Sequence, residues 1–345
     1  MPPYGPNKGP GEGRLSMMLD AMAQAPSEVL PSRFWEDLNR KNLRQLTESG
    51  YDNFKRTVAT NYFTWLLPLR DPQLRFLLSR IPVHRTVGYL LQSFTAGRHL
   101  PFTARQSFAY TLYTLMLWHF VSAIDRAAVL DRLQEPGAGN PPRVYHHGRL
   151  ISQDIANSCL EFMSIEEGGG LGEDTRTVLE LGAGYGRTAY TILALSPHLR
   201  YYIADIPPAL YICERYLADV LRDKRVFRFR PFSNYTHVRD ELESSQIAFF
   251  LPHQLEMLPP GSVDLFINIS SLHEMRMDQI AYYLGLVQKL VRRWVYLKEW
   301  KESFLPADGV VVRQGDYPIP KVWVPRFWRD CLVQTHFFEA LFEIV

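Results

Sequence analysis

The chain has 345 residues, of which 46% are hydrophobic and 21% charged, and its formal net charge at pH 7 is +2. This length suits one large or two medium domains, and so small a charge gives no electrostatic case for binding nucleic acid or an anionic membrane. The three cysteines, Cys159, Cys213 and Cys331, form no C-x-x-C pair and indicate neither a disulfide framework nor a zinc site. A reducing cytoplasm is therefore the expected location.

The first part of the chain predicts a tail followed by helices. Residues 1–30 begin with a segment rich in Pro and Gly and lack the apolar run of a signal peptide, so we expect a flexible tail. From 31 to 140 the apolar residues recur at helical spacing. We expect helices over 32–50, 51–68, 71–80, 84–95 and 103–133. This region is the predicted helical domain for substrate binding or dimerisation, and its many aromatic residues suggest a homodimer.

The remainder of the chain predicts an α/β domain. A loop rich in Pro and Gly at 135–143 leads into a connecting segment, 141–174, which contains an expected helix at 151–163. From 175 to 345 apolar strands alternate with helices, which predicts βαβ units and a parallel sheet covered on both faces. The expected strands are 177–181, 201–204, 247–251, 263–269 and 294–297. The segments 309–313 and 337–344 are expected to form a closing antiparallel pair.

A glycine loop follows the first of these strands. Glu180 is followed by L-G-A-G-Y-G-R, and glycines at a strand-to-helix turn let a ligand approach the backbone closely. A dinucleotide fingerprint would need a third glycine at position 187, where the chain has Arg187, so an NAD oxidoreductase is disfavoured. The spacing G-x-G-x-G beside Glu180 suits S-adenosylmethionine, which has no pyrophosphate to place at the helix N-terminus. Its methionyl ammonium group favours a nearby carboxylate.

An acidic residue also ends the next strand. Asp205 can accept hydrogen bonds from both hydroxyls of a ribose, which indicates an adenosine ligand. A structural alternative is a glycine turn with a capping or ion-paired aspartate. The expected cofactor-binding residues are Glu180, Gly182, Ala183, Gly184, Tyr185 and Gly186 in the loop, Asp205 and Ile206 after the second strand, Pro252, His253 and Gln254 near the adenine, and Asn268 and Ser270 after the strand 263–269.

Several segments together resemble the sugar O-methyltransferase family of bacterial enzymes that act on natural-product glycosides. They are E-L-G-A-G-Y-G-R (180–187), A-D-I-P-P-A-L (204–210), N-I-S-S-L-H-E-M (268–275), F-W-x-x-L (34–38) and N-F-K-R-T (53–57). The resemblance extends from about residue 31 to the end. It implies a Rossmann-like, seven-stranded class I methyltransferase sheet with an N-terminal all-helical domain, S-adenosylmethionine as methyl donor, and a sugar hydroxyl as acceptor. His273 departs from the family, where a polar residue such as Gln is usual.

Methyl transfer to a hydroxyl is an in-line displacement that requires alignment of the oxygen and removal of its proton. Ligands of open α/β sheets bind beyond the carboxyl ends of the strands, where the loop after 263–269 carries Ser271, His273 and Glu274. Histidine titrates near neutral pH, so His273 is the candidate general base. Glu274 is the candidate to orient it or bind the sugar, and Ser271 to bind the substrate.

Other interpretations remain open at the level of sequence. The pair His146 and His147 is a rival base and a candidate for substrate binding. A phenolic or polyketide hydroxyl is an alternative acceptor, and a methyltransferase-like protein that binds without catalysis is an alternative of another class. The intact Glu180, glycine loop and Asp205 argue against the last of these. No residues have a spacing dedicated to Mg²⁺, so no metal site is predicted.

Overall fold

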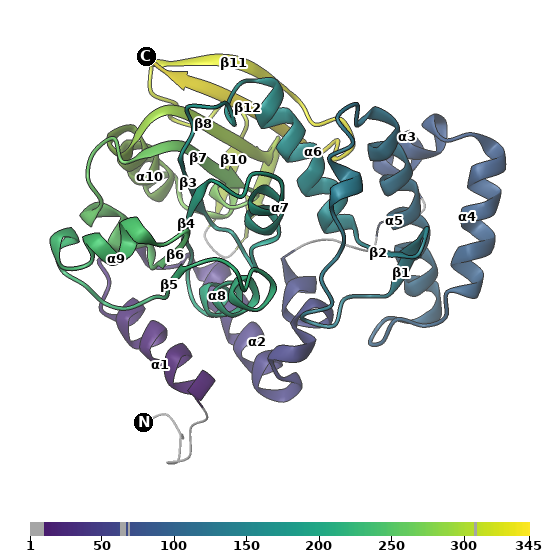
Figure 1. The fold of residues 1–345 in the computed structure, drawn as a ribbon, viewed down its shortest axis with the longest axis horizontal. Coiled ribbons are helices and arrows are strands. Elements are labelled where there is room, and N and C mark those ends of the chain that lie inside the picture. Colours follow the sequence, from purple (N-terminus) through teal and green to yellow (C-terminus); the bar gives the residue numbers. More distant parts are fainter. Residues whose placement is uncertain (1–9, 63–66, 68–69, 307–308) are drawn as a thin grey trace.

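The computed structural model describes residues 10–62, 67, 70–306 and 309–345. A group of helices lies beside an α/β part built on one large sheet (Figure 1). The α-helices are α1 Pro10–Ala23, α2 Arg33–Ser49, α3 Pro72–Arg80, α4 Val83–Thr95, α5 Ala104–Ile124, α6 Gln153–Glu167, α7 Arg187–Leu195, α8 Ala209–Val220, α9 Arg239–Ser244 and α10 Met277–Leu290. The strands are β1 Val144–His146, β2 Arg149–Ile151, β3 Thr177–Leu181, β4 Arg200–Ala204, β5 Val226–Phe227, β6 Ile247–Phe250, β7 Val263–Ile269, β8 Val291–Trp300, β9 Glu302–Leu305, β10 Val310–Arg313, β11 Trp323–Asp330 and β12 Phe337–Ile344.

The large sheet has the strand order β11-β12-β8-β7-β3-β4-β6-β5. The strands from β8 to β5 are parallel, whereas β12 runs antiparallel to both of its neighbours. Every residue of β3, β6 and β7 is buried, as expected for central strands covered by helices on both faces. The carboxyl ends of β3, β4 and β7 therefore meet at one edge, where the loops that follow them can form a site.

The predicted Rossmann-like α/β fold is confirmed, with eight strands in the large sheet rather than seven. The additional strand is β5, a two-residue strand at the edge beside β6. Of the two segments predicted to form the closing antiparallel pair, 337–344 is confirmed and 309–313 was wrong. The strand β12 pairs with β11, while β10 forms a separate hairpin with β9. Both β10 and β11 are rich in Val or aromatic residues, and the apolar pattern does not distinguish which of them reaches the sheet.

The N-terminal region differs from the expectation at several points. Residues 10–23 form α1 rather than a flexible tail, and Arg14 of this helix donates to Glu214 of α8 over 2.7 and 2.8 Å. Residues 1–9, where a tail was also expected, lie outside the described residues. Of the helix expected over 51–68, residues 51–61 form two short 3-10 helices in place of a continuous α-helix, while residues 63–66 and 68–69 lie outside the described residues. Helix α5 ends at Ile124 instead of near 133.

The helices begin and end as their sequences dictate. Ser32 caps α2 by accepting from the Trp35 N–H, and Thr103 forms a capping box with Gln106 at the start of α5. Most of α5 is buried, which explains its uncharged sequence. Within the described residues, no helix is both long and apolar enough to cross a membrane. The connecting segment contains the β1–β2 hairpin, which the sequence did not predict, and then α6.

Candidate active site

The glycine loop after β3 adopts a conformation that other residues rarely take. Gly182, Gly184 and Gly186 have φ angles of 76°, 60° and 91°. A Cβ atom on Gly182 would overlap Ser271, and one on Gly186 would lie 2.8 Å from the Sγ of Cys213. The loop therefore packs against both the β7 loop and α8, and its tight turn requires glycine for conformation and for space.

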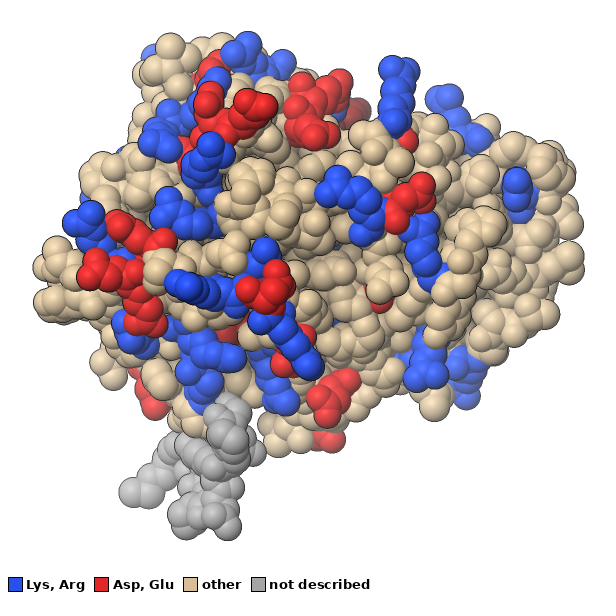
Figure 2. All heavy atoms as spheres, viewed as in Figure 1, with Lys and Arg blue, Asp and Glu red and all other residues tan. Residues whose placement is uncertain are grey.

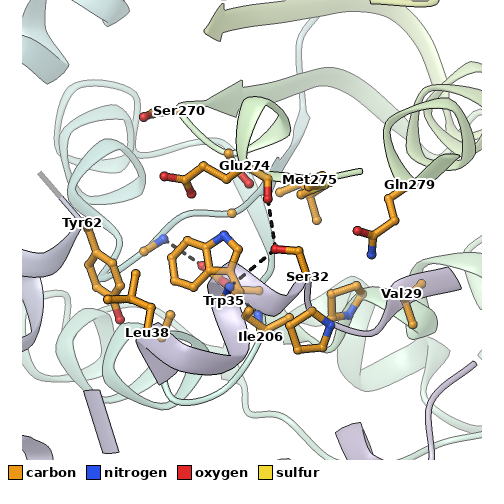
Figure 3. Close-up of a pocket in the computed structure, with 18 of the residues that line it drawn as sticks. Val29, Ser32, Trp35, Leu38, Tyr62, Ile206, Ser270, Glu274, Met275 and Gln279 are labelled. Carbon is orange, nitrogen blue, oxygen red and sulfur yellow. Dashed lines mark hydrogen bonds between the residues drawn. The ribbon is translucent and has the colours of Figure 1, made fainter. Parts of the chain in front are cut away.

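A first pocket lies beyond this loop, between the sheet and the segment that leads into α2 (Figure 3). Val29, Ser32, Trp35 and Leu38 line it from the N-terminal side. Gly182, Gly184, Asp205, Ile206, Pro252, Ser270 and Ser271 line it from the carboxyl ends of the strands. These last seven residues are all predicted site residues, and the structure brings them together.

Hydrogen bonds hold the N-terminal segment over the pocket. The Ser32 hydroxyl donates to the carbonyl oxygen of Glu274 over 3.2 Å. The Nε2 of Gln279, at the start of α10, donates to the carbonyl oxygens of Leu30 over 2.7 Å and Glu28 over 3.2 Å. The segment 27–38, which we call the strap, is thus attached to the loop after β7 and to the first turn of α10. Its contribution was not predicted from sequence.

Asp205 lines the first pocket and is held by two backbone N–H groups. Its Oδ1 accepts from the Ile206 N–H over 2.7 Å, and its Oδ2 accepts from the Gly184 N–H over 2.8 Å. Burial raises its pKa to about 7, although these two backbone hydrogen bonds act in the opposite direction. A carboxylate can accept about four hydrogen bonds, so Asp205 keeps capacity for two further donors.

Glu180 does not line the pocket. Its Oε2 accepts from the Tyr201 hydroxyl over 2.9 Å inside the sheet, and burial raises its pKa to about 7. The predicted contact with a methionyl ammonium group is therefore not supported by its position. Glu180 lies on β3 with its side chain in the core. The glycine motif alone does not predict this direction of the side chain.

Six other predicted cofactor residues support the pocket without lining it. Tyr185 donates to Asp154, and Gln254 bridges the Leu251 N–H and the Arg230 carbonyl oxygen. Asn268 donates to the Leu181 carbonyl oxygen over 2.8 Å and accepts from the Leu272 N–H over 3.1 Å. The residues that lie outside the lining are Ala183, Tyr185, Gly186, His253, Gln254 and Asn268. Their hydrogen bonds and packing fix the loops that carry the lining residues.

A second pocket adjoins the first. Its volume is about 690 Å³, against about 80 Å³ for the first, and it extends between the helical part and β8 and β9. The two pockets share Asn61, Tyr62, Ser270 and Glu274. A ligand group in the first pocket and one in the second would therefore meet at these four residues.

His273 lines the second pocket only, and it forms a buried pair that was not predicted. Its Nδ1 lies 2.6 Å from Oε2 of Glu299, which is fully buried on β8. The same carboxylate accepts from the backbone N–H groups of Ser271, over 3.5 Å, and His273, over 3.2 Å. Burial acts to lower the pKa of His273, but the hydrogen bond and the charges of Glu299 and Glu274 outweigh it, so the net pKa is raised. Glu299 could have been found from sequence, because it is an acidic residue near the carboxyl end of an expected strand.

Glu274 lies where the pockets meet rather than behind the histidine. Its Oε1 is 3.8 Å from Nε2 of His273, so Glu299 and not Glu274 orients the ring. Burial raises the pKa of Glu274 to about 7, while His273 and a hydrogen bond from Trp35 act to lower it. Glu274 therefore presents a carboxyl group to both pockets.

The rival histidines lie elsewhere. His146 ends β1 and His147 occupies the turn of the β1–β2 hairpin with a φ angle of 48°. Neither lines either pocket. Burial, followed by the neighbouring His147, lowers the pKa of His146 to about 4. The predicted substrate contact by this pair is thus not supported by the structure.

A buried ion cluster reaches the second pocket through Arg187, whereas its other members, Glu161 and Lys298, line a separate cavity. Arg187 donates to both oxygens of Glu161 over 2.6 and 2.9 Å, and Lys298 donates to Glu161 over 2.7 Å. Asp154 lies nearby, and burial raises its pKa to about 7, although the charge of Arg187 acts to lower it. Arg187 and Asp154 are the members of this group that line the second pocket. Across the described ranges, no group of three or more His, Cys, Asp or Glu side chains could hold a metal ion.

Comparison with known proteins gives structural likeness only. No known family and no curated protein matches the sequence. Magnesium protoporphyrin IX methyltransferase from Synechocystis PCC 6803 with bound SAM is 15% identical, with a TM-score of 0.36 over 66% of this chain and 95% of that one. A SAM-dependent methyltransferase from Aquifex aeolicus is 14% identical, with a TM-score of 0.35 over 53% of this chain and 89% of that one.

A third similar structure is an S-adenosylmethionine-dependent methyltransferase from Clostridium acetobutylicum. It is 10% identical, with a TM-score of 0.38 over 54% of this chain and 90% of that one. At such TM-scores and identities, these likenesses decide neither the cofactor nor the reaction of this chain.

Proposed function

We propose that this chain is an S-adenosylmethionine-dependent O-methyltransferase that binds the methyl donor in the first pocket and an acceptor hydroxyl in the second. One observation carries the proposal. The two pockets meet at Tyr62, Ser270 and Glu274, and His273, paired with Glu299 behind it, lines the second pocket only. A donor and an acceptor placed in this way would meet next to a base.

The residues of the first pocket fit the donor. The free capacity of Asp205 suits the two ribose hydroxyls, and the absence of side chains on Gly182 and Gly184 lets a ligand lie against the loop. Glu274 supplies a second carboxyl group, suited to the positive charge of the donor. The donor itself supplies a methyl group activated by its sulfonium.

His273 then acts as the general base. Because the Glu299 carboxylate accepts from Nδ1–H, the tautomer that it favours leaves Nε2 without a proton and able to accept one. Nε2 would accept the proton of the acceptor hydroxyl. The new oxygen–carbon bond would replace the bond between sulfur and the methyl carbon, so the donor would leave as neutral S-adenosylhomocysteine. Glu299 holds the ring and stabilises the imidazolium that forms, as the acidic member of a catalytic triad does.

Two side-chain oxygens of the second pocket support a sugar as acceptor. The Oδ1 of Asn157 and the Oε1 of Gln334 are buried and have no hydrogen-bond donor among the described residues, and both residues line the pocket. A ligand rich in hydroxyls would satisfy them. The aromatic lining at Phe34, Phe102 and Phe304 is the observation that favours the alternative, a phenolic or polyketide hydroxyl.

The donor site is tested by calorimetric titration with S-adenosylhomocysteine. We expect micromolar binding by the parent protein, weakened tenfold or more in Asp205→Ala, because lost hydrogen bonds to a charged group are worth about 1.5–3 kcal/mol. Asp240→Ala, on the surface of α9, is the matched control and should bind as the parent does. A folded protein that gives no binding heat would favour a methyltransferase-like fold without this activity.

With binding established, turnover identifies the acceptor class. We expect a panel of neutral glycosides to accept the methyl group from S-adenosylmethionine, and their aglycones to be poor acceptors. Methylation of the aglycones alone would replace the sugar with a phenolic or polyketide hydroxyl and leave the donor site in place.

A further inference from the structure

Helix α4 carries two apolar faces. Its inner face packs against α5, with Tyr89 and Ser93 buried. Its outer face carries Val83, Val87, Leu91 and Phe94, which are 79%, 49%, 62% and 75% exposed. These four residues, which we call the α4 stripe, recur at spacings of four, four and three along one side of the helix. A single exposed apolar residue needs no explanation, but a continuous row of four does.

We propose that the α4 stripe is the contact surface of a homodimer, in which α4 packs antiparallel against α4 of a second copy across a two-fold axis. This inference is independent of the reaction proposed above. In Figure 2 the outer edge of the molecule on the side of α4 is mostly uncharged, whereas the opposite side carries mixed Lys, Arg, Asp and Glu.

The exposed apolar area of the α4 stripe is close to the apolar area that a standard dimer interface buries on each partner. The four exposed fractions correspond to on the order of 450 Å² of apolar surface, taking about 150–200 Å² for each whole side chain. Somewhat more than half of a typical interface is apolar, and a standard interface buries about 800 Å² of each partner. The stripe would therefore supply the apolar part of an ordinary interface.

The charges on α4 are complementary to an antiparallel second copy. The exposed His84 and Arg85 lie in the first turn, where the positive end of the helix dipole disfavours cations, and neither forms an ion pair with any described residue. The last turn carries no basic side chain. An antiparallel partner places its C-terminal carbonyl groups beside these cations, whereas a parallel partner would place like charges together.

The spacing of the α4 stripe also fixes where its centre lies. In an antiparallel pair, Val83 of one copy lies toward Phe94 of the other. Val87 and Leu91, the middle residues of the stripe, then lie nearest the two-fold axis.

The test is the mass of the protein in solution, measured by light scattering after gel filtration over a range of concentrations. We expect twice the chain mass of 40.0 kDa for the parent protein and 40.0 kDa for Leu91→Glu and for Phe94→Glu. Val322→Glu, at a half-exposed apolar position far along the chain, is the matched control and should remain dimeric. A monomeric parent, or a dimer that both α4 variants retain, would overturn the proposal.

Two further measurements test whether the two α4 helices run antiparallel and whether the α4 stripe binds a second copy of the chain or a lipid surface. Val87→Cys should form a disulfide between two copies under mild oxidation, and a dimer that does not cross-link there would contradict the antiparallel pairing. Circular dichroism of each variant shows whether it is folded. A monomeric parent that sediments with anionic lipid vesicles, and loses this binding in Leu91→Glu, would show that the stripe serves a lipid surface instead.

Discussion

The Nδ1 atom of His273 lies 2.6 Å from Oε2 of Glu299, a carboxylate with no exposure to solvent. The same carboxylate also accepts from two backbone N–H groups of the loop that carries the histidine. Histidine, loop and strand β8 are thus fixed to one another. The Nε2 atom lies 3.8 Å from Oε1 of Glu274, a residue that lines both pockets.

Replacing His273 or Glu299 should change the rate of the reaction or its pH dependence in a way that a purely structural role would not. With a hydroxyl acceptor identified, His273→Ala should lower kcat by about 10²–10⁴-fold, the usual contribution of a general base. Glu299→Gln should move the acidic limb of the pH–rate profile to lower pH, because the charge of Glu299 is one cause of the raised pKa of His273. Glu302→Gln, an exposed position on β9, should change neither value.

The same pKa shift can be measured without substrate. The imidazole of His273 should titrate above its ordinary range in an NMR experiment on the parent protein and lower in Glu299→Gln. An unchanged titration in the variant would contradict the role assigned to Glu299, even if activity fell.

Glu180 should make the stability of the protein depend on pH. Its pKa is raised from 4.5 to about 7, so between these values the folded state binds more protons than the unfolded state. Stability therefore falls as pH rises through this window. Glu180→Gln keeps an acceptor for Tyr201 and removes the charge, so it should raise the free energy of unfolding at pH 8 by up to about 3 kcal/mol and change it little at pH 4. Urea denaturation at both pH values checks this; equal effects at the two would contradict the assignment.

The buried ion cluster should be sensitive to the loss of its shared carboxylate. Glu161→Gln leaves Arg187 and Lys298 with an uncompensated charge, which should lower the free energy of unfolding by about 3–5 kcal/mol. Glu243→Gln, at the exposed pair with Arg239, is the control and should have little measurable effect, because solvent screens such pairs. Denaturant midpoints of the two variants provide the comparison.

Opening of the strap should accompany binding of the donor. The first pocket has a volume of about 80 Å³, whereas ligand sites usually measure several hundred. We therefore expect residues 27–38 to move outward as the ligand enters. Hydrogen exchange should change in this segment when S-adenosylhomocysteine is added and stay constant in the β1–β2 hairpin. Exchange that is the same in the strap with and without ligand would place the ligand elsewhere.

The α/β part was predictable because its signals are local. Apolar runs separated by glycine and helical spacing predict β3, β4 and β7, and the acidic residue after β4 predicts Asp205 at the pocket. The edge strand β5 and the exchange of β10 for β11 were not predictable, since short strands are decided by tertiary pairing rather than by propensity.

The residues of the candidate site also divide into those that local sequence predicts and those that only the folded structure reveals. Ser270, Asp205 and Gly182 follow strands directly and were found from sequence, whereas Glu299 and Trp35 reach the site from distant parts of the chain. Glu180 and Asn268 lie in the right segments, but alternation along a strand points their side chains into the core. Spacing gives the segment, and only packing gives the direction of each side chain.

The central claim is that the methyl donor binds in the first pocket with its sulfur where the two pockets meet. A crystal structure of the complex with S-adenosylhomocysteine tests it most directly. We expect the ribose hydroxyls on Asp205 and the sulfur beside Ser270 and Glu274, on the side of the junction nearer His273. A ligand bound away from Asp205, or with its sulfur directed away from the second pocket, would contradict the proposed reaction.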